Sequence, residues 1–357
     1  MRAPALIVGG GPAGAAAAMR LVHAGLPHLL VERTRETGDA LCGGFLSWRT
    51  LQSLTALGIG ADRLNVRPIT RVRVVAGTRE VEARLPAPGL AVSRRRLDSV
   101  MLTQAVAMGV PVERGVTVRA VEGGEARTAD GATIAADALF LATGKHDVRG
   151  VARPEDARGD DPALGLRVRL APSPALSAQV GDAVELHLFP GGYAGVALQE
   201  DGSVNLCMAV ERSRLQEAGS PAALLRTLGD ALPVLGDRLA AWDGAAPDAI
   251  ANVPYGWRAR TTSPHVFRLG DQAGVIPSLA GEGMGIAIAS GRAAAAAYAR
   301  GETPPAWQAR FARTLATPIG VAALLRRLAE SRRAPALLPL LRPALIRIVA
   351  DLTRISD

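Results

Sequence analysis

The chain has 357 residues, of which 48% are apolar and 21% charged, and its formal net charge is +8. A length above roughly 250 to 300 residues favours two packed domains over one. Aromatic residues make up only 3% of the chain, whereas grooves for nucleic acid combine basic residues with stacking aromatics, so we expect no nucleic-acid partner.

The two cysteines, Cys42 and Cys207, lie far apart and form no CxxC pair. This spacing argues against a disulfide framework, a zinc site or a dithiol redox centre, and we expect no bound metal. No apolar run approaches the roughly 18 residues of a membrane span, and the chain enters a strand-like segment without a signal-peptide pattern. We therefore expect a cytoplasmic protein.

A strand–helix–strand unit opens the chain. The hydrophobic pattern predicts a buried strand at residues 5–8, a helix at 13–24 and a second strand at 28–32. The turn between the first strand and the helix, GGGPAG at residues 9–14, carries the GxGxxG pattern. This order of elements is typical of a dinucleotide-binding unit.

Each glycine of that turn has a physical reason. Gly9 permits the tight turn, Gly11 lets a diphosphate approach the backbone, and Gly14 lets helix and strand pack closely. The helix N-terminus supplies unpaired N–H groups for the anion. Glu32 stands eighteen residues after Gly14, where a carboxylate can accept a hydrogen bond from a ribose hydroxyl. We predict dinucleotide binding rather than a chance glycine turn, without separating FAD from a nicotinamide.

A second glycine-rich stretch lies late in the chain. A predicted strand at residues 266–269 runs into Asp271, at the carboxyl end of a strand where ligands bind in open α/β sheets. Gly281, Gly283 and Gly285 then lead into a helix that we expect to begin near Ile286. The bare N-terminus of such a helix can lie against the pyrimidine edge of a flavin ring and stabilise negative charge there.

Together these segments resemble the FAD-dependent monooxygenases and reductases of the p-hydroxybenzoate hydroxylase fold, including the geranylgeranyl reductases. The family's GDAAG…P…GxG segment, which binds FAD, is similar to residues 270–285, with Gln272 where alanine is common. The run RRRLD at 94–98 resembles the family's Arg-x-x-Phe/Leu-Asp pattern beside the flavin, and ALFLATG at 138–144 resembles the strand that closes the cofactor domain.

The motifs and the resemblance together imply an FAD site drawn from several separate segments. Its expected members are Gly9, Gly11, Pro12, Ala13, Gly14, Glu32, Arg33, Cys42, Gly43, Arg94, Thr143, Gly144, Asp271, Gly274, Pro277, Gly281, Gly283, Met284 and Gly285.

The expected fold class is α/β, with a Rossmann-type FAD-binding domain of the p-hydroxybenzoate hydroxylase (GR2) type, an antiparallel-sheet substrate domain and C-terminal helices. The expected boundaries are a discontinuous FAD-binding domain at residues 1–65, 90–160 and 255–302, a substrate domain at 66–89 and 161–254, and a C-terminal helical region at 303–357.

Two half-buried strands are predicted in the substrate domain, at residues 184–189 and 203–210. We hypothesise that the face carrying Glu185, His187 and Phe189, with Asn205 and Cys207 on the next strand, overlooks the flavin. A solvated sheet face is the alternative. The candidate catalytic residues are Cys42, His187 and Tyr193; for Cys42, simple packing is the alternative to proton donation.

The C-terminal stretch, residues 304–357, is predicted to be helical and is interrupted by Pro335, Pro339 and Pro343. From residue 321 onward it holds seven arginines against three acidic residues. Helices of this kind can cover a domain or lie on an anionic membrane surface. We favour a cover because the prolines interrupt the apolar stripe, and keep the peripheral membrane contact as the alternative.

The resemblance implies an FAD-dependent oxidoreductase. We favour a monooxygenase that hydroxylates an aromatic, polyketide-like or lipid-like small molecule through a flavin hydroperoxide, because the family's Tyr-x-Trp-x-Phe reductase signature is replaced by GYAGVA at residues 192–197. A flavin-dependent reductase or dehydrogenase acting on a C=C bond is the first alternative, and a non-enzymatic flavin-binding protein the second. NAD(P)H is expected only as a transient electron donor, with another external donor or acceptor as the alternative.

Overall fold

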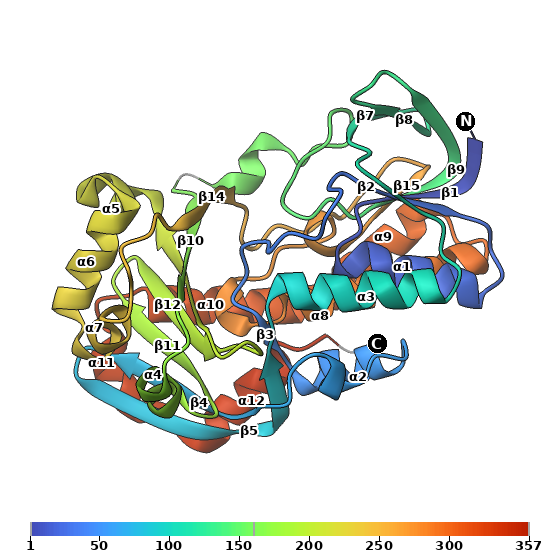
Figure 1. Cartoon of the computed structure of the whole chain (residues 1–357). Helices are drawn as coiled ribbons and strands as arrows, with labels where there is room; N and C mark the ends of the chain where they lie inside the picture. Colours follow the sequence, from blue (N-terminus) through green and yellow to red (C-terminus); the bar gives the residue numbers. More distant parts are fainter. Residues whose placement is uncertain (1, 160, 356–357) are drawn as a thin grey trace.

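The computed structural model describes residues 2–159 and 161–355, which form two sheets joined by helices (Figure 1). The first sheet has seven strands in the order β6-β2-β1-β9-β8-β7, with β15 beside β9. Its strands are β1 (Arg2–Val8), β2 (Leu29–Glu32), β6 (Val112–Arg114), β7 (Val118–Glu122), β8 (Glu125–Thr128), β9 (Thr133–Leu141) and β15 (Val266–Arg268).

The core of this sheet is parallel. Strands β6, β2, β1, β9 and β15 run side by side in one direction, and only the β7–β8 and β8–β9 pairs are antiparallel. The predicted strand–helix–strand unit is confirmed as β1, α1 (Pro12–His23) and β2. The carboxyl ends of β1 and β15 therefore open on the same edge, where both glycine-rich stretches begin.

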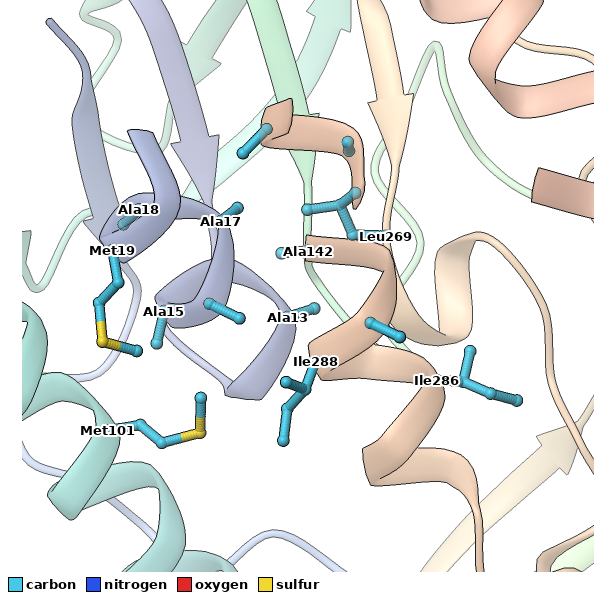
Figure 2. Packing of buried hydrophobic residues seen from close by; sticks show 14 of the residues in the cluster. Ala13, Ala15, Ala17, Ala18, Met19, Met101, Ala142, Leu269, Ile286 and Ile288 are labelled. Atoms are coloured by element: carbon cyan, nitrogen blue, oxygen red, sulfur yellow. The ribbon is translucent and has the colours of Figure 1, made fainter. Parts of the chain in front are cut away.

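Three helices pack on one face of the parallel sheet: α1, α3 (Arg94–Ala107) and α8 (Gly283–Ala299). Figure 2 shows α1 and α8 meeting through small side chains, with Ala13 and Ala17 on the side facing α8. A Cβ on Gly291 would overlap the backbone oxygen of Ala13. This close approach sets the middle of α8 beside the first two turns of α1, although the two helices lie far apart in the sequence.

The second sheet has eight strands in the order β14-β10-β13-β12-β11-β4-β5-β3. They are β3 (Phe45–Leu46), β4 (Pro68–Ala76), β5 (Arg79–Ala91), β10 (Ala163–Leu170), β11 (Ala183–Phe189), β12 (Gly192–Leu198), β13 (Val204–Glu211) and β14 (Asp248–Val253). All neighbours are antiparallel except β11 and β4. The two strands predicted at residues 184–189 and 203–210 correspond to β11 and β13, with β12 between them.

Helices enclose this sheet on both sides. A core formed with α4 (Pro174–Val180), α6 (Pro221–Ala231) and α7 (Pro233–Leu239) fills one face. The other face is partly covered by C-terminal elements. Three further helices of seven or more residues are α2 (Trp48–Thr55), α5 (Arg212–Ala218) and α9 (Pro304–Thr314). The C-terminal cover consists of α10 (Ala316–Ala329), α11 (Ala334–Leu337), the 3₁₀ turn η5 (Leu338–Leu340) and α12 (Pro343–Leu352). None of the helices in residues 2–159 and 161–355 combines the length and apolar character needed to traverse a bilayer.

Candidate active site

A cavity of about 1490 Å³ runs from the β1–α1 turn to the C-terminal helices. Pockets for one small molecule measure roughly 300 to 1000 Å³, so this cavity has room for a dinucleotide and a second molecule. One end is lined by backbone and polar groups of the first sheet, and the other by aliphatic side chains of the second sheet and the C-terminal cover.

The diphosphate end is formed by the first turn of α1. This helix has no side-chain N-cap and no acidic residue in its first turn, so its N-terminal N–H groups and partial positive charge are available to an anion. Gly9 has a φ of +108°, and a Cβ on Gly14 would overlap the Gly9 carbonyl oxygen. Gly11 lines the cavity and has more room, because an added Cβ there would meet only the Arg94 guanidinium, at 3.4 Å.

Glu32 lies at the end of β2 and is held by local hydrogen bonds. Its Oε2 accepts from the Gly10 N–H at 2.7 Å, and its Oε1 accepts from the N–H and hydroxyl of Thr34 at 2.9 and 2.8 Å. A carboxylate has about four acceptor positions. One position on Oε2 therefore remains for a ribose hydroxyl.

Arg94 places a positive charge beside the glycine turn. Its Nε and Nη2 donate to the two carboxylate oxygens of Asp98, one helical turn later, at 2.9 and 2.7 Å. Burial alone would lower the pKa of Arg94, but the facing carboxylate raises it above its ordinary value. The guanidinium is therefore a fixed cation at the cavity wall.

The expected flavin-ring end gathers residues from three distant segments. Asp271 follows β15 in the 3₁₀ turn η3 (Gly270–Gln272), and Gly281 follows η4 (Ser278–Ala280) with a φ of +65°. The helix α8 begins at Gly283 without a side-chain cap. Added Cβ atoms on Gly43, Gly144 and Gly283 would meet nothing within 4 Å, although all three line the cavity. Bare backbone facing open space on several sides fits a broad, flat group such as a flavin ring.

Lys145 is a site residue that the sequence reasoning missed. Its Nζ lies 3.0 Å from Oδ2 of Asp271, and the carboxylate raises the pKa of the ammonium group. Arg153 and Gln272 fix the same loop, since Arg153 donates to the backbone oxygens of Lys145 and Asp271 at 2.6 and 3.1 Å. Lys145 is the only lysine of the chain, and this singularity was the feature of the sequence that could have identified it.

The replacement of alanine by Gln272 has a structural reason. The side chain is fully buried, and its Nε2 donates to the backbone oxygens of Gly144 and His146 at 2.9 and 3.0 Å. The loop after β9 is thus joined to the turn that carries Asp271. A short aliphatic side chain could not make these bonds.

Cys42 lines the cavity between the two ends and is half-buried. Its Sγ accepts a hydrogen bond from the Gly44 N–H at 3.5 Å. Asn205 on β13 holds the segment in place, because its Nδ2 donates to the backbone oxygens of Cys42 and Gly43, both at 3.0 Å. Cys207 also borders the cavity, and burial raises the pKa of its thiol to about 12.

The prediction for the faces of β11 is wrong. Val184, Leu186 and Leu188 line the cavity, whereas His187 lies on the opposite face, 1% exposed, with its Nε2 3.0 Å from Oε2 of Glu185. Glu185 also accepts from Arg238 at 2.9 and 3.1 Å. Half-buried Arg73 and buried Arg238 both form ion pairs with this carboxylate, so Glu185 and its partner His187 are held away from the cavity.

The cross-strand register explains the error. Leu186 pairs with Gly195 on β12, and Gly195 pairs with Cys207 on β13. Cys207 therefore shares the cavity face with Leu186, not the face of His187. A shift of one residue in register exchanges the faces of a strand, and periodicity alone does not supply that register.

A cluster of three hydroxyl groups stands in the apolar part of the cavity wall. Tyr193 on β12 is 3% exposed, and its hydroxyl forms a hydrogen bond with Oγ of Ser278. The hydroxyl of Tyr255 lies 2.7 Å from the same Oγ, and Arg326 lies over the Tyr255 ring at 5.0 Å. Burial raises the pKa of both tyrosines, so the cluster presents neutral hydrogen-bonding groups.

The structure places most of the expected site residues along the cavity. The lining includes Gly9, Gly11, Pro12, Ala13, Glu32, Arg33, Cys42, Gly43, Arg94, Thr143, Gly144, Tyr193, Asp271, Gly281, Gly283 and Met284. Four expected FAD residues do not line it: Gly14, Gly274, Pro277 and Gly285. Gly274 packs under Leu315 and Gly285 against Glu282 and Thr50, so these two glycines permit close packing behind the wall.

Comparisons with known proteins agree with this arrangement. A family model described as FAD binding domain matches residues 2–150. By sequence, no curated protein matches the chain.

Three solved structures illustrate the likeness in fold. PqsL of Pseudomonas aeruginosa, described as a probable FAD-dependent monooxygenase, has a TM-score of 0.73 at 19% identity, over 94% of this chain and 99% of its own. A flavoprotein/dehydrogenase from Cytophaga hutchinsonii has a TM-score of 0.77 at 16% identity, over 99% and 92%. A geranylgeranyl bacteriochlorophyll reductase-like protein from Thermoplasma acidophilum has 0.67 at 20%, over 99% and 94%.

The expected resemblance and the α/β fold class are thereby confirmed. Residues 2–150 match an FAD binding domain, and the whole described chain fits the p-hydroxybenzoate hydroxylase-type fold.

Proposed function

We propose that this protein is an FAD-dependent monooxygenase that hydroxylates a small apolar or aromatic molecule. The observation that carries the proposal is the continuity of the cavity from the β1–α1 turn to an aliphatic chamber bounded by Leu186, Leu188 and Tyr193. A cofactor held at the first place can meet a substrate held at the second within one continuous, mostly apolar cavity. PqsL, of similar fold, has been solved in complex with 2-aminobenzoylacetate, which supports a small aromatic substrate.

The residues of this chain would hold FAD at both ends. The first turn of α1 and Arg94 would bind the diphosphate, Glu32 a ribose hydroxyl, and Asp271 the chain that leads to the ring. FAD, when bound and reduced, supplies the two electrons needed to insert one atom of O₂ into a substrate and release the other as water. The N-terminus of α8 at Gly283 would stabilise the negative charge that reduction places on the ring.

Tyr193, Ser278 and Tyr255 would orient the substrate. Their hydroxyl groups lie in a largely aliphatic part of the wall, and their neutral state suits a hydroxyl or carbonyl oxygen of the substrate better than a carboxylate. The Tyr193→Phe variant should raise KM for an accepted substrate roughly fivefold with little change in FAD content, because one hydrogen bond contributes about 1 kcal/mol. Tyr298→Phe, whose hydroxyl bonds Pro4 on the outside of the first sheet, is the matched control.

Reduction of a C=C bond is the second candidate, and Cys42 favours it. A half-buried thiol at the cavity wall could donate the proton that accompanies hydride transfer to a double bond. In that reading the Cys42→Ala variant loses turnover, whereas hydroxylation does not require the thiol.

The nature of the product decides between these candidates. The purified yellow protein should be reduced with NADPH or NADH, or with dithionite if neither reacts, and exposed to isotopically labelled O₂ with candidate substrates. Gain of one labelled oxygen atom supports hydroxylation, and gain of two hydrogen atoms supports reduction. Bound flavin that never turns over with any donor would contradict both and favour a non-enzymatic flavin-binding protein.

A further inference from the structure

The last helix of the described chain is apolar on two sides. Ile346, Val349 and Ala350 of α12 line the cavity. Leu345, Ile348 and Leu352, spaced three and four residues apart, are 44%, 56% and 47% exposed. A cover helix of a water-soluble domain normally presents a polar outer face. The outer face of α12 is therefore suited to contact with something apolar.

The cavity opens on this same surface. Leu328 of α10, Leu340 of η5 and Leu345 of α12 line the cavity and are also 46%, 69% and 44% exposed. Side chains that both border the cavity and are exposed indicate an opening between them. The rim of this mouth is aliphatic, and its three sides come from the separate C-terminal elements seen at the lower left of Figure 1.

Positive charge surrounds the aliphatic rim. Arg332 and Arg333 directly precede α11. Arg342 directly precedes α12, and Arg347 lies within it. All four side chains are exposed. Within residues 2–159 and 161–355 none of the four forms an ion pair, whereas the nearby acids Glu330 and Asp351 are paired with Arg326 and Arg49. The surface thus carries uncompensated basic charge next to exposed leucine and isoleucine.

We propose that this surface docks on an anionic lipid membrane. The docking surface comprises the exposed apolar residues of α10, η5 and α12 and the four arginines around them: Leu324, Leu328, Leu340, Leu345, Ile348, Leu352, Arg332, Arg333, Arg342 and Arg347. Aliphatic side chains enter the boundary between headgroups and acyl chains, and arginines attract anionic headgroups. An anionic membrane matches both features, the exposed aliphatic side chains and the unpaired arginines beside them.

Docking in this way has a consequence for the substrate. The aliphatic mouth would open toward the acyl chains, so a molecule with a long apolar tail could enter the chamber without crossing water. This route for the substrate rests on the proposed function and narrows the substrate class to a membrane-dissolved lipid. The docking itself does not depend on the flavin chemistry.

Sedimentation with vesicles tests the docking. The FAD-loaded full chain should sediment with vesicles of phosphatidylcholine and phosphatidylglycerol at low ionic strength, and far less with vesicles of phosphatidylcholine alone. The Arg342→Gln/Arg347→Gln variant should bind the anionic vesicles about thirtyfold more weakly, since each arginine near the surface contributes about a fivefold factor. Arg127→Gln/Arg260→Gln removes two exposed arginines outside the docking surface and should bind as the parent does.

A matched pair of variants tests the apolar contact. Ile348 is 56% exposed on the outer side of α12 and does not line the cavity, and Val106 is 57% exposed on α3. Ile348→Asp should lose most vesicle binding and keep its flavin spectrum, whereas Val106→Asp should keep both. Both variants receive the same charge at similarly exposed positions, so a loss confined to Ile348→Asp assigns the contact to α12.

Two outcomes would overturn the proposal. The first is a parent protein that ignores anionic vesicles at low salt, or an Ile348→Asp variant that binds them unchanged. The second is a lipid-free dimer, seen by light scattering, that Ile348→Asp dissociates, which would make a second copy of this chain the occupant. A protein without hydroxylase activity can still bind the vesicles, and an active enzyme can fail to bind them. The vesicle experiments therefore test the docking independently of the proposed function.

Discussion

Arg354 donates through Nη1 to Oε2 of Glu282 at 2.7 Å, and both side chains are buried. Glu282 directly precedes Gly283, where α8 begins at the cavity. The same Nη1 also donates to the backbone oxygen of Ala280 at 2.7 Å. The end of the C-terminal cover is therefore joined to the glycine loop that borders the expected flavin ring.

Removing the guanidinium should loosen this loop. We expect Arg354→Leu to lower the free energy of unfolding by about 3 to 5 kcal/mol, because Glu282 would remain as a buried, uncompensated carboxylate. FAD affinity should fall in parallel. Urea unfolding and titration with FAD measure the two effects.

The control for that variant is a surface pair. Arg300 and Glu302 form an exposed ion pair, so Arg300→Leu should change stability by less than about 1 kcal/mol. The double variant Glu282→Gln/Arg354→Leu should recover part of the loss. Equal effects of Arg354→Leu and Arg300→Leu would show that the buried pair has no special role.

A side chain at Gly283 should block the cofactor without unfolding the protein. An added Cβ meets nothing within 4 Å there, so Gly283→Leu has room in the empty protein but would occupy space needed by the ring. We expect FAD affinity to fall by at least about a hundredfold, equivalent to about 2.7 kcal/mol. Gly320→Leu is the matched control, since Gly320 on α10 is exposed and equally free of neighbours. Retained affinity in Gly283→Leu would place the ring elsewhere.

Two neighbouring residues on β11, Leu186 and His187, should differ in what they affect: substitution of His187 should lower stability, and substitution of Leu186 should change KM. His187→Ala removes a buried partner of Glu185 and should cost about 1 to 3 kcal/mol of stability, with KM within about twofold of the parent. Leu186→Phe fills part of the chamber and should change KM roughly tenfold at nearly constant stability. Steady-state kinetics and thermal melts on both variants provide the comparison. A large KM change for His187→Ala alone would restore that histidine to the substrate site.

Acid should destabilise the substrate sheet through Glu185. Burial alone would raise its pKa, but hydrogen bonds from His187 and Arg238 lower it from 4.5 to about 2. A carboxyl whose folded pKa is depressed contributes stability above its unfolded pKa and loses it as the pH falls toward the folded value. The difference between 4.5 and about 2 corresponds to about 3 kcal/mol, which should disappear between pH 4.5 and about 2.

Urea unfolding at several pH values measures this loss. The Glu185→Gln variant should be less stable than the parent at neutral pH, since Arg73 and Arg238 lose their buried partner, and should show a flatter dependence in this window. The Glu122→Gln variant, which changes an exposed carboxylate on β7, should keep the dependence of the parent. An unchanged slope for Glu185→Gln would assign the acid sensitivity to other groups.

The parts of the site that could be predicted are those encoded by local patterns. The turn at Gly9 and Gly11, the acid at Glu32 and the glycines before α8 each follow from a short motif beside a strand or helix. A short motif can encode these features because a diphosphate and a flat ring require a close approach of the nearby backbone.

The parts that could not be predicted depend on pairing across the chain. The face of His187 follows from its register against β12, and the contact between Arg354 and Glu282 joins two segments that no local pattern connects. Lys145 acquires its role only because η3 brings Asp271 beside the loop after β9. Periodicity reports which residues of one strand share a face, but not which neighbour that face meets.

The contact between Gly291 and the backbone of Ala13 has a consequence for how the protein is made. A ribosome releases the β1–α1 turn long before α8, and the two helices can meet only after the second sheet has been synthesised between them. Contact of a cofactor with both ends of the cavity therefore requires that most of the chain, through α8, has already been synthesised. A truncated product ending before residue 283 would leave the ring end of the cavity without its helix.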